Sequence, residues 1–184
     1  MDRLEREGTT MEWLHFVPAR SGSLQSADVA IMDWHPKFGD DFRRLNEEWI
    51  TRYFVLEPDD QRTLNDPERE VIAPGGAIVV AVVDGEVVGT GALVVEGDGV
   101  YELAKMAVTP AWQGHGIGRL VAERLLAIAR ERGAKKVELV SQSGLAPALK
   151  LYTSLGFRHV PVGAVSYQRA DVRMELVDPQ GWHP

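Results

Sequence analysis

The strongest constraint on the fold is a pair of β-branched runs joined by a two-residue turn. Residues 77–83 and 86–95 are rich in valine, and only Asp84-Gly85 separates them. An Asp-Gly pair between such runs predicts a tight hairpin, because both residues tolerate the positive φ angles that this turn requires. A glycine-containing turn at 97–99 then leads to a further apolar run over 100–108. Three neighbouring strands joined by short turns predict an antiparallel meander.

Helical and strand patterns flank this meander. Before it, alternation over 27–34 predicts a strand. An apolar stripe at steps of three and four then predicts a helix, formed by Phe42, Leu45, Trp49, Tyr53 and Leu56. A second helix is predicted over 59–72. After the meander the patterns predict a helix, a buried strand, a helix and two strands, over 116–132, 136–142, 147–155, 157–162 and 165–176. Because a strand-helix-strand crossover joins parallel strands, part of the sheet should be parallel.

The composition fits one globular domain and excludes several classes of protein. The chain has 184 residues, 45% hydrophobic and 26% charged, which is enough for one hydrophobic core. It has no cysteine, which excludes disulfides, thiolate metal sites and cysteine nucleophiles. Its formal charge of −7 argues against nucleic-acid and anionic-membrane partners, which require clustered Lys and Arg. We expect one domain over 26–184, preceded by a loosely attached N-terminal extension over 1–25.

Two further features bear on location and on metal binding. No apolar run approaches the ~20 residues that span a bilayer, and the charged N-terminal segment is unlike a signal peptide, so a cytoplasmic protein is expected. The five histidines show no H-x-H or H-x-x-x-H spacing, so no metal site is expected.

A glycine-rich loop precedes the helix that is predicted after the meander. Gly114, Gly116 and Gly118 remove Cβ atoms where backbone N–H groups converge, and a helix N-terminus offers unpaired donors with a partial positive charge. The loop therefore suits a phosphate, and Arg119 and Arg124 would add charge. By spacing alone, a tight turn explains the same glycines equally well. A dinucleotide fingerprint is excluded, because it would require glycine at the position of Arg119.

Two motifs give this loop a more specific meaning. Segment 113–118, Gln-x-x-Gly-x-Gly, resembles the Gln/Arg-x-x-Gly-x-Gly/Ala signature of the GNAT superfamily of N-acetyltransferases. Segment 152–157, Tyr-x-x-x-Gly-Phe, resembles a second motif of the same superfamily, in the same order and on the same kind of element. The resemblance extends over residues 27–176. It implies a mixed α+β fold, with a central, mostly antiparallel twisted sheet of about seven strands and about four helices.

The resemblance also implies that acetyl-CoA is the cosubstrate. Backbone N–H groups of the strand before the loop would pair with pantetheine and polarise the thioester carbonyl. The implied cofactor-binding residues are Met106, Ala107, Val108, Gln113, Gly114, His115, Gly116, Ile117, Gly118 and Arg119. His115 is also explained as a solvent-facing loop residue. Many members carry Asn seven residues before the tyrosine, where this chain has Leu145, which puts one pantetheine contact in doubt.

Transfer to an amine requires a proton acceptor, because an alkylammonium has a pKa of ~10.4. Glu102 is the candidate base. It lies 11 residues before Gln113, the separation of the strand glutamate that is the base in the superfamily's histone acetyltransferases. Strand alternation places Glu102 on the face of Ala104 and Met106, unless a bulge intervenes. The alternative is an exposed carboxylate at a strand end.

Tyr152 is the candidate acid for the departing CoA thiolate. A phenol pKa of ~10 lies just above the ~8.5 of a thiol, so proton transfer is only mildly uphill. An aromatic residue on an amphipathic helix is otherwise explained as a core residue. The match to the second motif favours the catalytic role.

Two functions remain open. The first is an N-acetyltransferase that moves an acetyl group from acetyl-CoA to a primary amine of a small-molecule or peptidyl acceptor by direct attack. The alternative is a non-catalytic acyl-CoA-binding regulatory module. Eight acidic residues between 47 and 70 are explained as a solvated face or, if some point inward, as a site for a cationic acceptor. An open edge strand near the C-terminus would allow a homodimer.

Overall fold

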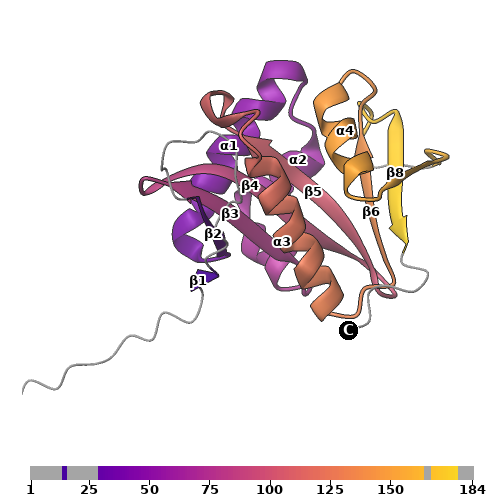
Figure 1. Cartoon of the computed structure of the whole chain (residues 1–184), viewed down its shortest axis with the longest axis horizontal. Helices are drawn as coiled ribbons and strands as arrows, with labels where there is room; N and C mark the ends of the chain where they lie inside the picture. The colour runs from indigo at the N-terminus through magenta and orange to yellow at the C-terminus, as the bar shows by residue number, and fades with distance from the viewer. Residues whose placement is uncertain (1–13, 16–28, 164–166, 178–184) are drawn as a thin grey trace, which may run out of the picture.

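The computed structural model describes residues 14–15, 29–163 and 167–177 (Figure 1). Within them eight strands form one sheet, in the order β1-β2-β3-β4-β5-β6-β8-β7. The strands are β1 (Leu14–His15), β2 (Ala30–Asp33), β3 (Ala77–Val83), β4 (Glu86–Gly97), β5 (Val100–Val108), β6 (Lys136–Ser141), β7 (Arg158–Val160) and β8 (Val172–Val177). The α-helices are α1 (Gly39–Tyr53), α2 (Pro58–Asn65), α3 (Ile117–Glu131) and α4 (Ala146–Ser154). Short helical turns are η1 (Pro36–Phe38), η2 (Glu68–Ile72) and η3 (Pro110–Trp112).

The central meander forms as its sequence predicts. β3 and β4 pair antiparallel across Asp84-Gly85, whose φ angles of 50° and 83° are those of a tight hairpin. β5 spans the predicted residues and pairs antiparallel with β4. The β5–β6 pair is parallel and the other neighbouring pairs are antiparallel, which confirms the mixed, mostly antiparallel sheet. The eighth strand is the two-residue β1 at one edge.

Helices cover both faces of the sheet (Figure 1). On one face α3 buries Ile117, Val121 and Leu125 against the central strands, and α4 packs into the same apolar cluster. On the other face α1 and α2 bury a second set of side chains, among them Phe42 and Leu64. The sheet is therefore the middle layer of three, and its central strands are buried from both sides.

Two helix predictions are wrong in detail. Tyr53, predicted on the buried stripe of α1, is 49% exposed, and α1 ends there, which leaves Leu56 outside the helix. The buried face includes Asn46 instead, whose side-chain amide donates to the Phe42 carbonyl at 2.9 Å. An internal partner of this kind makes a buried amide tolerable.

The helix predicted over 59–72 is interrupted. α2 ends at Asn65, and the chain resumes as the π-helical turn η2 at Glu68. Pro67 causes the break, because proline lacks the N–H that a continuous helix requires and disfavours helical angles in the residue before it. That residue, Asp66, has a φ of −142°.

The parallel pair β5–β6 is short, and this determines where a ligand can enter. Its register joins Val100, Tyr101 and Glu102 to Lys136, Val137 and Glu138, and no pair follows. Beyond Glu102 the two strands separate, as Figure 1 shows. Backbone N–H and C=O groups on the β6 side of β5 therefore lose their strand partners, in the middle of an otherwise continuous sheet.

One prediction falls almost wholly outside the described residues. The N-terminal extension over 1–25 lies outside them except for Leu14–His15 in β1. In the part of the chain that the structure describes, no helix combines the length and the apolarity needed to cross a bilayer.

Candidate active site

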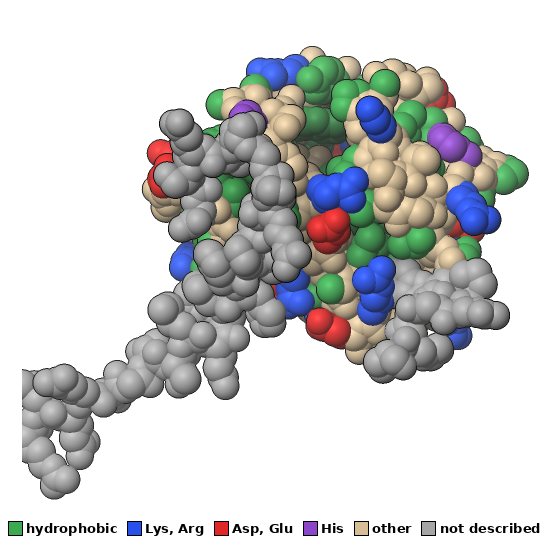
Figure 2. Space-filling view, in the orientation of Figure 1, with side chains coloured by type: hydrophobic (Ala, Val, Ile, Leu, Met, Phe, Trp, Pro, Cys, Tyr) green, Lys and Arg blue, Asp and Glu red, His purple; other side chains and the backbone are tan. Residues whose placement is uncertain are grey.

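A cleft of about 580 Å³ opens where β5 and β6 separate. Its walls come from the second half of β5, the start of α3, the end of β6, α4, the end of α1 and residues 167–170. In Figure 2 apolar side chains surround a hollow near the top of the face shown. The cleft divides into a side next to the glycine loop, called the loop side below, and a side next to α1, α2 and residues 167–170, called the acceptor side.

The glycine loop lies on the loop side, and its conformation depends on glycine. Gly114 and Gly116 have φ angles of 79° and 83°, and a Cβ on either residue would meet no atom within 4 Å. Gly116 is the N-cap of α3, and no side chain caps the helix. The N–H donors at the start of α3 are therefore not taken up by a capping side chain. Gln113 donates from its side-chain amide to the Val108 carbonyl at 3.0 Å, which ties the loop to the end of β5.

The structure brings nine of the ten predicted cofactor-binding residues to the cleft: Met106, Ala107, Val108, Gln113, Gly114, Gly116, Ile117, Gly118 and Arg119. His115 is not part of the lining. Its ring packs against Trp112 with centroids 5.6 Å apart, and its Nδ1 lies 3.0 Å from the Gln113 carbonyl oxygen. Arg124, considered as a phosphate partner, is tied instead to Asp33 through Nε at 2.9 Å and Nη2 at 2.6 Å.

A β-bulge shapes the floor of the cleft. Thr90 pairs with Ala107 and Ala92 with Ala104, so β5 has one residue more than β4 between these pairs. Lys105 takes up the extra length with a left-handed φ of 54°. The expected alternation is therefore wrong after Ala104. Met106 packs with the α3-side core, whereas Lys105 reaches toward α2 on the opposite face.

Glu102 lines the cleft at the last position of β5 that pairs with β6. It is half-buried, so the alternative of an exposed strand-end carboxylate does not describe it. Burial raises the pKa of Glu102 to about 7, and the nearby carboxylates of Glu96 and Glu138 add to the effect. Lys105 and Arg173 oppose it. A carboxylate with this pKa is a competent proton acceptor at neutral pH.

Tyr152 of α4 also lines the cleft, and it is 8% exposed. Its ring packs edge-on against Phe157 with centroids 6.0 Å apart. Burial raises the pKa of the phenol to about 12. This makes full proton transfer to a thiolate with a pKa of ~8.5 more unfavourable than the sequence suggested, but it keeps the hydroxyl protonated and able to donate a hydrogen bond.

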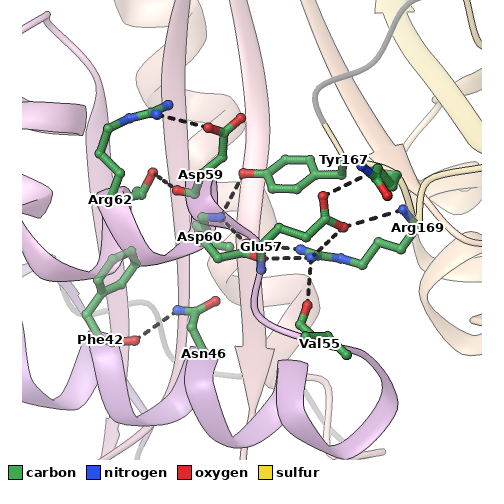
Figure 3. Close-up of polar contacts among 12 residues, drawn as sticks. Phe42, Asn46, Val55, Glu57, Asp59, Asp60, Arg62, Tyr167 and Arg169 are labelled. Atoms are coloured by element: carbon green, nitrogen blue, oxygen red, sulfur yellow. Dashed lines mark hydrogen bonds and ion pairs between the residues drawn. The ribbon is translucent and has the colours of Figure 1, made fainter.

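An ion-pair network that the sequence did not indicate forms the acceptor side. The Asp60 carboxylate is fully buried and accepts from Lys105 Nζ at 2.7 Å. Arg169 donates to both oxygens of Asp60, at 2.7 Å and 3.0 Å, and to Glu57 at 3.2 Å. Lys105 Nζ also lies 2.8 Å from the Tyr167 hydroxyl. Figure 3 shows Tyr167 and Arg169 pointing toward the start of α2, so the network fastens residues 167–170 to that helix.

The ion-pair network decides whether the acidic residues between 47 and 70 form a site for a cationic acceptor. Of the eight between 47 and 70, Asp60 is the buried one. Burial alone would raise the pKa of Asp60, but hydrogen bonds from Arg169 and Lys105 outweigh it and lower that pKa below its ordinary value. Because two cations of the protein already neutralise Asp60, it does not provide a site for a cationic acceptor. Among the described residues, no three His, Asp or Glu side chains are grouped as metal ligands.

Known proteins resemble both the sequence and the fold. The sequence pattern of the acetyltransferase (GNAT) family matches residues 42–157. The Escherichia coli (strain K12) protein named "Uncharacterized N-acetyltransferase YjgM" is 32% identical over 136 residues, which are 68% of this chain and 81% of that protein. The N-acetylaspartate synthetase of Rattus norvegicus is 40% identical over 88 residues, but these cover only 29% of its length.

Solved structures share the architecture at low sequence identity. A GNAT-family acetyltransferase from Staphylococcus aureus Mu50 superimposes with a TM-score of 0.74 at 17% identity, over 80% of this chain and 97% of that one. An acetyltransferase from Salmonella typhimurium, solved with acetyl-CoA, gives a TM-score of 0.63 at 21% identity, over 82% of this chain and 94% of that one. The split sheet, the loop and these relatives define an acyltransferase enzyme. The chain belongs to the acetyltransferase (GNAT) family.

Proposed function

We propose that the protein is an N-acetyltransferase that transfers the acetyl group of acetyl-CoA to the primary amine of a small molecule. The observation that carries this proposal is the position of the cleft. It has a loop suited to phosphate at one end and a half-buried glutamate, with a pKa of about 7, at the other. A binding module would need the loop alone, so the placement of Glu102 favours the enzyme over a regulatory acyl-CoA sensor.

The residues of the loop side fit acetyl-CoA. The pyrophosphate would lie on the N–H groups at the start of α3, where the helix dipole favours an anion and Gly114 and Gly116 leave room. The free edge of β5 beyond Glu102 supplies N–H and C=O groups for the pantetheine amides and an N–H for the thioester carbonyl. Acetyl-CoA supplies the activated thioester that makes acetyl transfer favourable.

Glu102 and Tyr152 have separate roles in this proposal. Ionised Glu102 accepts the proton of the acceptor ammonium, directly or through a water molecule, and so produces the neutral nucleophile. Tyr152 donates a hydrogen bond toward the position of the departing sulfur. Its high pKa makes it a stabilising donor and not a full proton source.

The acceptor side favours a small molecule over a polypeptide. The ion pairs of Arg169 with Asp60 and Glu57 hold residues 167–170 against α2, so this side of the cleft is walled by a fastened segment. The N-acetylaspartate synthetases are named for a small product, and mycothiol acetyltransferase of Thermobifida fusca, 42% identical over 67 residues, is named for a small thiol. Both names agree with an acceptor of this size.

An amine panel tests the proposed function. We expect thiol release from acetyl-CoA to depend on an added small primary amine and to be slow with peptides of the same net charge. Free thiol is measured with a chromogenic reagent, and the acetylated product by mass spectrometry. Tight acetyl-CoA binding without turnover on any amine would instead support the regulatory module.

Replacing Gly116 with alanine should weaken acetyl-CoA binding by about tenfold or more, because the new methyl group enters the proposed phosphate position. Gly133 is the matched control. It too has a positive φ, 68°, and open space around a Cβ, but it ends α3 far from the cleft. Both variants should lose about 1 kcal/mol of stability for adopting a left-handed backbone. Equal acetyl-CoA affinities, measured by isothermal titration calorimetry, would remove the loop from the binding site.

A further inference from the structure

Glu102 has a charged neighbour on the next strand. In the parallel β5–β6 pair, Glu102 is the register partner of Glu138, so the two side chains leave the same face of adjacent strands. The Glu138 carboxylate accepts from Arg173 of β8 at 2.7 Å and from Lys136 at 2.9 Å. Burial alone would raise the pKa of Glu138, but these two hydrogen bonds outweigh it and keep that pKa below its ordinary value. Glu138 is therefore a fixed anion beside the proposed base.

Other charged and titratable groups face Glu102 from each element packed around it. They are Glu96 of β4, Lys105 of β5, Glu138 of β6, Arg173 of β8 and Tyr167 of the 167–170 segment. Glu96 has the largest effect of these charges on the pKa of Glu102, but it is exposed, so solvent screens its field. Lys105 is already paired with Asp60. Glu138 and Arg173 are 18% and 24% exposed and hold each other in place, and the register places Glu138 directly beside Glu102.

We propose that Glu138 and Arg173 are positioning residues that adjust the proton affinity of Glu102 through opposite charges, one on the neighbouring strand β6 and one on β8, the strand beyond it. The proposal rests on the role of Glu102 as the base. Glu138 opposes ionisation of Glu102, so Glu102 holds its proton up to a pH near neutrality. Arg173 favours ionisation and limits this effect. The pair thereby adapts an ordinary carboxyl group to accept a proton from an ammonium at neutral pH.

The two charges predict shifts of opposite sign. Glu138→Gln removes the anion and leaves Arg173 with less compensation, so Glu102 should ionise at a lower pH than in the wild type. Arg173→Met removes the cation while Lys136 still holds Glu138, so Glu102 should ionise at a higher pH. If Glu138, Arg173 and Lys136 only supported the fold, the two variants would not shift the ionisation of Glu102 in opposite directions.

Glu175→Gln is the matched control. Glu175 is the register partner of Glu138 on β8 and binds Lys136 at 2.9 Å, so it belongs to the same group of ion pairs. Its carboxylate also lies 3.6 Å from Arg173, but the charges that shift the pKa of Glu102 include Arg173 and not Glu175. We expect Glu102 to ionise at its wild-type pH in this variant. Arg173→Lys should also keep the wild-type value, because it retains the charge.

The experiment measures ionisation and rate separately. The side-chain carboxyl carbon of Glu102 is titrated by NMR in ¹³C-glutamate-labelled wild type and in each variant, with urea unfolding as a check of folding. The pH profile of kcat/KM for thiol release is measured on the same samples. Opposite NMR shifts for Glu138→Gln and Arg173→Met, with Glu175→Gln unchanged, support the proposal. Unmoved or same-sign NMR shifts overturn it. NMR shifts that the rate profiles do not follow also support the charge effect, but remove Glu102 as the base.

Discussion

Replacing Glu102 with glutamine is expected to lower kcat/KM for the amine by about 100- to 10,000-fold at neutral or higher pH, the range that a positioned base contributes. Glutamine keeps the size of the side chain and loses the proton acceptor. In the wild type the pKa of Glu102 is about 7, so the rate should rise as pH increases through 7 and level off above it. The variant should lose this step. Initial rates of thiol release between about pH 5 and pH 9 provide the measurement.

The companion variant Tyr152→Phe separates the two proposed roles. It removes the hydroxyl from a buried ring that packs on Phe157, and should reduce kcat while the acidic limb of the profile stays in place. If the rate of Glu102→Gln still rises through pH 7 as in the wild type, water alone accepts the proton. An unchanged kcat in Tyr152→Phe would remove Tyr152 from the mechanism.

The same Glu102 variant should be more stable than the wild type at high pH. Because the pKa of Glu102 is raised from 4.5 to about 7, the folded state binds this proton more tightly than the unfolded chain does. The contribution of Glu102 to the free energy of unfolding is therefore fully present below pH 4.5 and is lost as pH rises through 7. Glu102→Gln should recover up to about 3 kcal/mol above pH 7, measured by urea unfolding. A gain in stability with a loss of activity is typical of a functional carboxylate.

The parts of the site that could be predicted from the sequence depend on local patterns. The bounds of β5 follow from turns on both sides, and the loop is visible because glycines recur just before an amphipathic helix. Glu102 is a candidate base through the resemblance, because it lies as far before Gln113 as the strand glutamate of the superfamily's histone acetyltransferases does. Each of these signals involves fewer than about 20 residues, within which strand and helix periods determine the geometry.

The acceptor side could not be predicted, because its contacts join distant parts of the chain. Lys105 and Asp60 are 45 residues apart, and Asp60 and Arg169 are 109 residues apart. Lys105 reaches Asp60 through a bulge that no glycine marks, although its left-handed φ would ordinarily favour one. One local signal was available. Asp60 lies three residues after Glu57, the N-cap of α2, and the two side chains form a capping box.

Replacing Asp60 with alanine is expected to destabilise the fold by about 3–5 kcal/mol, because it leaves the buried ammonium of Lys105 without its anion. The Lys105 side chain is 5% exposed and that of Asp60 is fully buried, so water cannot take the place of the lost partner. The variant also removes both hydrogen bonds from Arg169 to Asp60, so only the Glu57 contacts still hold residues 167–170. Because the folded pKa of Asp60 is lowered, its contribution to stability is present above its ordinary pKa of 3.8 and is lost as pH falls further. Urea unfolding at neutral pH measures the loss.

Asp59→Ala is the control, since Asp59 neighbours Asp60 but forms an exposed ion pair with Arg62 at 2.9 Å. Exposed pairs of this kind contribute about 0–1 kcal/mol. The double variant Asp60→Ala with Lys105→Met removes both charges and should recover much of the stability, because no unpaired ion remains buried. Residues 167–170 keep only their Glu57 contacts in the double variant, so the KM for the amine should stay raised while acetyl-CoA affinity is unchanged. A double variant with restored stability and a wild-type KM would show that the network supports the fold and has no part in holding the acceptor.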